Sequence, residues 1–481
     1  MDRRYTLLTK TFEDTEKFLI QPGALCLGND FYNSFLEDND KLGFATRLVY
    51  ENDEKLKKFG IKQIRNFTDV MKKNCKVEEF IDQNLFETLC DIMINSNDLQ
   101  VVYELSLAII NITKFSSIYT SILANSKRIK DIFKLMVNIP EYQLKNLFVW
   151  IFSNIIGDSE ETYTACVAQV DLMSYAVDCI RNEQINPPYH NTTLFWLLGN
   201  LIKYRSSNVN QSYQIFPIIF KYLKSYIDRG LFEEALFAVE KLSSNYTEES
   251  FELMNEWKIY DILIPFISTK TDFSELRSIF KILVDISWND EKSIVGMYKS
   301  KILDYFENFL SETLIISKSN VSYYIKHNET FRYLLICISN FAATSKQEIK
   351  DELIRSTKIP FFLLELVKLS SKNTILIEVL EVFKNALDTS YSNIKMELLR
   401  IQTLELFCDN LPKQDFEIQR LCLGGILNFL LYADEIMKNK NIVKIQLETL
   451  GAVTHIDNLQ QSTDEGVAII SYNIMEKYFN V

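Results

Sequence analysis

The chain has 481 residues, of which 47% are hydrophobic and 24% charged, a balance typical of folded proteins and not of disordered ones. A chain of this length exceeds one compact core and predicts about three domains or one elongated array. Its 12 glycines and 8 prolines are too few for turn-rich β architectures or glycine-loop nucleotide folds, which leaves helices. The net charge of −12 argues against general binding of nucleic acid or anionic membranes and favours a basic ligand.

Other features of the sequence exclude several classes of function. The eight cysteines form no Cys-x-x-Cys pair and only three histidines are present, so we expect reduced thiols, an intracellular protein and no metal site. We expect neither a secreted nor a membrane-spanning chain, because a clean apolar signal segment and long uncharged apolar runs are lacking. Catalytic signatures such as Gly-x-Ser-x-Gly are also lacking, so we expect neither an enzyme nor a cofactor.

A helical pattern of four apolar residues at positions i, i+3, i+4 and i+7 recurs eight times along the chain. The first set consists of Leu105, Ala108, Ile109 and Ile112, and it surrounds the reference position Asn111. Equivalent sets surround seven further reference positions, which are Asn154, Asn200, Lys241, Asp285, Asn340, Asn385 and Asn428. Successive reference positions are 43, 46, 41, 44, 55, 45 and 43 residues apart. A period of about 40–47 residues is typical of HEAT and armadillo repeats, which stack to share one core.

Two weaker units extend this array at its ends. The earlier unit contains Arg65, and the final unit includes Val467 to Phe479. The one long spacing contains the polar stretch Ser311 to Thr330, which we interpret as a loop inserted between repeats. The sequence therefore predicts an all-α solenoid of about ten armadillo repeats over residues 53–481, preceded by an N-terminal segment over residues 1–52. Unrelated amphipathic helices are the alternative, which the eight matched sets of offsets disfavour.

The positions beside the apolar stripes carry the functional signal. Asparagine occupies six of the eight reference positions, although it is a mediocre helix former. Four residues earlier, on the same helix face, Trp150 and Trp196 occupy matching positions in adjacent repeats. A row of amides can bond to the backbone of an extended peptide, and indole rings between them can hold Lys or Arg side chains. This pattern favours the binding of an extended basic peptide.

Structural roles compete with this interpretation. Each asparagine can instead bond to a neighbouring loop carbonyl, and the two tryptophans can belong to the core. Asp158, which follows Gly157, is more often a helix-end or turn residue than a ligand contact. Three downstream residues of the same face would usually be solvated surface, namely Lys281, Asp285 and Glu381.

The sequence around these positions resembles the importin-alpha family, armadillo adaptors that carry nuclear localisation signals. The family motif Trp-x-x-x-Asn followed by Ile-x-Gly-Asp is present from Trp150 to Asp158, and the next repeat has Trp196 to Asn200. The segment from Gly451 to Phe479 resembles the family's final repeat. The resemblance spans Asp53 to Phe479, and its motifs are specific in two or three places. It implies a right-handed superhelix, a location in cytoplasm and nucleus, and binding of Lys/Arg-rich signals as extended peptides in a concave groove.

The resemblance also implies two cargo-binding sites in that groove. The major site comprises Asn111, Thr120, Trp150, Asn154, Asp158, Trp196 and Asn200. Within it, Thr120 and Asp158 match the positions that hold the ammonium group of the key lysine. The minor site comprises Lys281, Asn340, Glu378 and Asn385. Because Ile336 and Glu381 replace both tryptophans expected there, we expect a degraded minor site and monopartite cargo.

Several positions depart from the family pattern. Leu107 replaces the first tryptophan of the row, and Phe115 stands where the family prefers glycine. The family's N-terminal arm is strongly basic and binds importin-beta, whereas residues 1–50 contain six Lys/Arg against eight Asp/Glu. Partnership with importin-beta and with an export receptor therefore stays open. The alternative function is an armadillo scaffold for other peptide, cytoskeletal or signalling partners, without a transport role.

Overall fold

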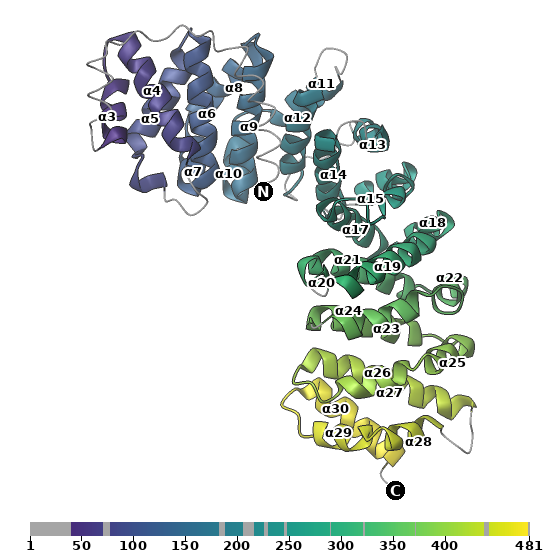
Figure 1. Cartoon of the computed structure of the whole chain (residues 1–481). Helices are drawn as coiled ribbons and strands as arrows, with labels where there is room; N and C mark the ends of the chain where they lie inside the picture. The colour runs from purple at the N-terminus through teal and green to yellow at the C-terminus, as the bar shows by residue number, and fades with distance from the viewer. Residues whose placement is uncertain are drawn as a thin grey trace. The chain divides into compact units, whose positions relative to one another are not determined.

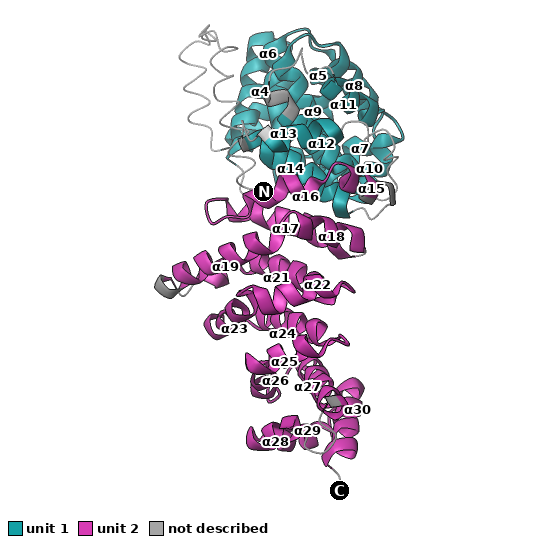
Figure 2. Cartoon of the chain, turned by 90° about the vertical axis from the view of Figure 1, so that its right-hand side faces the viewer, with its two compact units in different colours: residues 1–245 teal, residues 246–481 magenta. Residues whose placement is uncertain are grey.

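The structure is a computed structural model that describes ten ranges, namely residues 40–70, 77–181, 188–204, 216–225, 229–244, 248–288, 290–320, 323–370, 372–436 and 442–479. Every regular element within these ranges is a helix, as the sequence predicts (Figure 1). The chain divides into two compact units, residues 1–245 and residues 246–481 (Figure 2).

Unit 1 is built on five long helices that pack in series, which we call its spine helices. They are α4 (Glu54–Asp69), α6 (Leu99–Phe115), α9 (Tyr142–Asp158), α12 (Pro188–Leu201) and α14 (Arg229–Ser244). Shorter elements connect or flank them: α3 (Lys41–Val49), η1 (Val77–Glu79), α5 (Gln83–Asn95), α7 (Ser117–Asn125), α8 (Arg128–Asn138), α10 (Glu160–Val167), α11 (Leu172–Arg181) and α13 (Phe216–Ser225). Helix α3 packs against α4, and the domain boundary at residue 53 stays a prediction.

Unit 2 repeats this plan with five spine helices of its own. They are α17 (Phe273–Trp288), α21 (Asn328–Ala343), α24 (Asn373–Leu387), α27 (Phe416–Ile436) and α30 (Glu465–Ile474), and each packs against the next. The other elements are α15 (Glu248–Glu256), α16 (Ile259–Leu263), η3 (Ile264–Phe266), α18 (Glu291–Lys299), α19 (Ile302–Ser319), α20 (Tyr323–Lys326), α22 (Gln347–Asp351), η4 (Glu352–Ser356), α23 (Ile359–Leu369), α25 (Ser392–Arg400), α26 (Thr403–Asn410), α28 (Ile442–Thr449), α29 (Ala452–Leu459) and η5 (Met475–Phe479).

The predicted apolar stripes form the cores of both units. On α9, the stripe of Phe148, Ile151, Phe152 and Ile155 is fully buried. The corresponding four residues are also buried on α6, α12, α14, α17, α21, α24 and α27. Since each stripe is covered by neighbouring helices, one repeat could not bury its own apolar face alone. The number of repeats and the right-handed superhelix stay predictions.

The predicted loop insertion at Ser311–Thr330 is wrong, because helices α19, α20 and the start of α21 occupy most of this stretch. The hydroxyl groups of Thr313 and Ser317 are buried, and each donates a hydrogen bond to a backbone carbonyl three residues earlier in α19. Tyr324 of α20 is also buried. The polar composition was misleading because hydroxyl side chains can be satisfied by the carbonyls of their own helix.

Left-handed backbone conformations mark four helix starts in unit 2. The angle φ is 46° at Lys258, 61° at Lys301, 67° at Gln402 and 68° at Gly451, the residues that precede α16, α19, α26 and α29. A side chain makes this conformation unfavourable by about 1 kcal/mol or more, whereas glycine adopts it readily.

We expect Gln402→Gly to raise the free energy of unfolding of unit 2 by up to about 1 kcal/mol, because glycine removes the left-handed strain at this exposed position. Urea unfolding followed by circular dichroism measures the change. Gln402→Ala is the control, since it shortens the side chain and keeps the strain. Equal stability of the two variants would contradict the prediction.

Six cysteines lie within the described ranges, and none of these six forms a disulfide. Burial raises the pKa of the Cys90, Cys166 and Cys337 thiols to about 12, so these three thiols stay protonated at neutral pH. In the described part of the chain no individual helix has the length and apolar character to cross a membrane. Only when they are counted together do Leu99–Phe115 and Ser117–Asn125, a bent pair, reach such a length and apolar composition.

Candidate functional site

The predicted lysine-binding residues Thr120 and Asp158 lie in contact where α7 meets the end of α9. Asp158 is the last residue of α9, and its side chain is exposed. Its carboxylate accepts hydrogen bonds from the Thr120 hydroxyl at 2.7 Å and from the Ser117 hydroxyl at 2.8 Å. Sequence reasoning missed Ser117, although its position three residues before Thr120 on one helix face could have indicated it. An ionised carboxylate has further lone pairs, so Asp158 can also accept a hydrogen bond from an ammonium group.

The end of α9 already binds one ammonium group from this chain. The exposed Lys203 donates a hydrogen bond from Nζ to the Gly157 carbonyl oxygen at 2.9 Å, and its Nζ lies 4.8 Å from the centre of the Tyr204 ring. Carbonyl groups at the C-terminal end of a helix carry partial negative charge, which attracts cations. The region around Asp158 is therefore suited to lysine side chains. Lys203 was not identified from the sequence as part of this region.

Aromatic side chains follow the spine helices α9, α12 and α14. The Trp150 and Trp196 rings meet edge to face, with centroids 6.2 Å apart and planes at 81°. Trp150 is only 4% exposed, whereas Trp196 is half-buried and thus accessible to a ligand. The Phe237 ring packs so closely on Gly199 that a Cβ there would lie 2.6 Å from it. The ammonium of Lys241 lies 5.0 Å from the Phe237 ring centre, which shows that this row of rings can accept a cation.

Five of the six predicted asparagines use their amide groups between neighbouring spine helices. The Nδ2 groups donate from Asn111 to Asp69 (2.6 Å), from Asn154 to the Ile110 carbonyl and the Thr113 hydroxyl (3.1 Å each), from Asn200 to the Ser153 carbonyl (3.1 Å), from Asn340 to Ser287 (2.8 Å) and from Asn385 to Ser339 (2.9 Å). Asn111 and Asn200 are buried, while Asn154, Asn340 and Asn385 are half-buried. These amides therefore bond within the protein, which is the structural role that competes with peptide binding. The three half-buried amides retain access to solvent.

The predicted minor site is already occupied by a charged pair. Glu378 is buried and accepts a hydrogen bond from Nε of Arg332 at 3.0 Å. Burial raises the pKa of Glu378 above that of an ordinary glutamate, against the opposing effect of Arg332. Lys281, which was also assigned to the minor site, is half-buried on α17. A basic side chain would have to compete with Arg332 for Glu378, and the weaker minor site stays a prediction.

No group of His, Cys, Asp and Glu side chains in the described ranges is arranged to hold a metal ion. At the end of α9 the Asp158 carboxylate and the Gly157 carbonyl accept hydrogen bonds, and the Lys203 ammonium lies near the Tyr204 ring.

No protein-family model matches the chain, and no curated protein matches its sequence. The crystal structure of an engineered protein from the Northeast Structural Genomics Consortium is similar, with a TM-score of 0.72 and 15% identity over 91% of this chain and 98% of that one. That likeness establishes the fold alone. Two shorter helices precede a spine helix in each clear repeat, as α7 and α8 precede α9. This order of three helices is typical of armadillo repeats. The chain has an armadillo-like repeat fold.

Designed armadillo repeat proteins also match about half of the chain. One has a TM-score of 0.45 and 16% identity, over 54% of this chain and 98% of that one. Another, described in complex with the peptide (KR)4, has a TM-score of 0.45 and 17% identity, over 55% of this chain and 99% of that one.

Proposed function

We propose that this armadillo-like protein is a nuclear import adaptor that binds Lys/Arg-rich localisation signals as extended peptides along α6, α9 and α12. The observation that carries the proposal is the exposed Asp158 carboxylate, positioned by the hydroxyl groups of Ser117 and Thr120. It lies on the helix that also presents Asn154. The proposed activity needs no enzyme chemistry and no cofactor, and it places the protein in both cytoplasm and nucleus.

Each group has a separate part in the proposed complex. Asp158 accepts a hydrogen bond from the ammonium of one peptide lysine, and the half-buried indole of Trp196 contacts the aliphatic stem of a neighbouring basic residue. Because the amide nitrogen of Asn154 already donates within unit 1, its carbonyl oxygen is the atom left to accept from a peptide N–H. The net charge of −12 speeds the encounter with a basic peptide and makes it sensitive to salt.

Titration of the full chain into a fluorescent Lys-rich signal peptide tests this proposal. We expect saturable binding that weakens as salt is added, because solvent-exposed charge pairs are screened over roughly 10 Å at 0.1 M salt. A wild-type protein that does not bind at high micromolar concentration would reject the import function.

A scaffold for other, non-basic peptides is the second candidate. It is favoured by the burial of Trp150 and by the use of the amide donors within the chain. Selection from an unbiased peptide library separates the two functions, because an import adaptor should enrich Lys- and Arg-rich sequences. A pull-down with importin-beta and with an export receptor then tests for the transport partners, which a scaffold would not bind.

Trp196→Ala should weaken binding of a short basic peptide about tenfold, and Ile336→Ala should weaken it far less. An accessible indole beside a cation contributes roughly 1–2 kcal/mol, whereas isoleucine offers only contact area. Both side chains are half-buried on spine helices, so the pair is matched in exposure. Fluorescence anisotropy measures both affinities, and equal losses would contradict the assignment of the stronger site to unit 1.

A further inference from the structure

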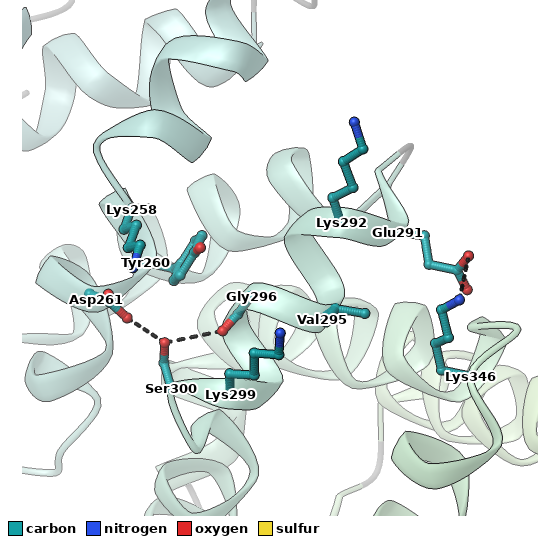
Figure 3. Close-up of a pocket in the computed structure, with 10 residues that line it drawn as sticks. All are labelled: Lys258, Tyr260, Asp261, Glu291, Lys292, Val295, Gly296, Lys299, Ser300 and Lys346. Atoms are coloured by element: carbon teal, nitrogen blue, oxygen red, sulfur yellow. Dashed lines mark hydrogen bonds and ion pairs between the residues drawn. The ribbon is translucent and has the colours of Figure 1, made fainter.

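A concave site lies in unit 2, among residues that belong to none of its spine helices. It is a cleft of about 780 Å³ lined by residues next to or within α16, α18 and α22 (Figure 3). Its charged lining comprises four lysines and two carboxylates: Lys258, Lys292, Lys299, Lys346, Asp261 and Glu291. This excess of positive charge contrasts with the net charge of −12 of the chain.

Both carboxylates of the cleft are engaged within the protein. Asp261 accepts a hydrogen bond from the Ser300 hydroxyl, which joins α16 to the end of α18. Glu291 accepts hydrogen bonds from the Ser345 hydroxyl, from the Thr344 hydroxyl at 3.1 Å and from the Ser345 backbone N–H at 3.0 Å. These bonds lower the pKa of Glu291, which therefore stays ionised at neutral pH. The two acidic groups thus hold the walls of the cleft together.

The lysines, by contrast, are available to an anion. Lys258, Lys292 and Lys299 are exposed, and none has an ion-pair partner among the residues that the structure describes. Lys346 makes one long ion pair, 3.9 Å from Glu291. In Figure 3, Lys258 and Lys299 lie on either side of Gly296 and Tyr260, while Lys292 points away from the other labelled residues.

Lys258 lies at the edge of the cleft and directly precedes α16. Its left-handed φ of 46° recurs at Lys301, Gln402 and Gly451, which precede α19, α26 and α29, so this conformation belongs to the way these helices begin.

We propose that this cleft binds a soluble small molecule that carries two or more phosphate groups. Lysine ammonium groups bind phosphates as compact point charges, and several of them around one cavity favour a ligand with several anionic groups. The volume lies in the range of about 300–1,000 Å³ that is typical of small-molecule sites. Tyr260 is largely buried, and its hydroxyl packs so closely on Gly296 that a Cβ there would collide with it. This contact keeps the floor of the cleft between Lys258 and Lys299 compact.

This site is independent of the proposed peptide site, because all of its residues belong to unit 2 and none lies on a spine helix. The Asp158→Lys variant should therefore bind the phosphate ligand as the wild type does. Failure of peptide binding and failure of phosphate binding are then separate results.

Calorimetric titration of the full chain with inorganic tripolyphosphate tests the proposal. We expect one saturable site, weakened about tenfold or more by the double substitution Lys258→Glu with Lys299→Glu, because two charge-assisted contacts become repulsive. Lys326→Glu is the matched control, since it reverses an exposed lysine of unit 2 outside the cleft and should change the affinity less than twofold. If the double variant is unfolded by circular dichroism, Lys299→Met removes one charge, keeps the stem and should still weaken binding several-fold.

Three outcomes would overturn the proposal. The first is no binding of tripolyphosphate by the wild type at millimolar concentration. The second is an equal loss in Lys326→Glu, which would indicate only a general attraction of charge. The third is binding of phosphoinositide-containing phosphatidylcholine vesicles or of a phosphorylated peptide without binding of soluble tripolyphosphate, which would assign the lysines to a membrane surface or to a protein partner.

Discussion

Asp158→Lys is expected to lower the affinity for a Lys-rich signal peptide about a hundredfold. The substitution removes the carboxylate that accepts from Ser117 and Thr120 and places a positive charge where the peptide ammonium would bind. Loss of a charge-assisted hydrogen bond removes roughly 1.5–3 kcal/mol, and repulsion between like charges adds to the loss. Fluorescence anisotropy with a labelled peptide at low and at high salt measures the effect.

Two further variants make this measurement specific. Asp131→Lys is the matched control, because it makes the same change of charge at an exposed position of α8. We expect it to lower the affinity less than twofold. Thr120→Val removes one of the two hydrogen bonds that position the carboxylate, so it should give a smaller loss than Asp158→Lys. A loss in Asp131→Lys as large as that in Asp158→Lys would show that the peptide responds only to net charge.

Those features of the fold that follow from helix geometry could be predicted from the sequence. The stripe of Phe148, Ile151, Phe152 and Ile155 is buried because residues at these spacings share one helix face. The same reasoning located the spine helices of both units. It failed at Ser311–Thr330, because polar composition does not distinguish a loop from a helix whose hydroxyl groups are satisfied by its own carbonyls.

The candidate site could be predicted only in part. The resemblance assigned Thr120 and Asp158 to one lysine ammonium, and the structure places them in contact. Ser117 was missed although it lies on α7 with Thr120, and Lys203 was missed because it follows a neighbouring spine helix, α12. The burial of Trp150 and the hydrogen bonds of the amide groups depend on how closely adjacent spine helices approach one another. That distance is set by residues on the facing helix, so no periodicity within one helix reveals it.

Phe152→Ala is expected to lower the free energy of unfolding of unit 1 by about 3–5 kcal/mol, the usual result of removing a buried aromatic ring. Phe152 is fully buried on α9, where its ring meets that of Phe133 edge to face with centroids 6.0 Å apart. Alanine would leave a cavity that the flanking spine helices α6 and α12 cannot easily fill, because both are fixed by their own buried stripes. Urea unfolding followed by circular dichroism measures the loss.

Phe80→Ala is the control for that measurement, since Phe80 also belongs to unit 1 but is 47% exposed. We expect it to cost less than about 1 kcal/mol, because little apolar surface leaves water when this ring packs. In a repeat array each repeat is stabilised mainly by the repeats beside it. Phe152→Ala should therefore also reduce amide-exchange protection in the neighbouring spine helices α6 and α12. Loss of protection confined to α9 would contradict the inference that successive stripes of unit 1 form one continuous core.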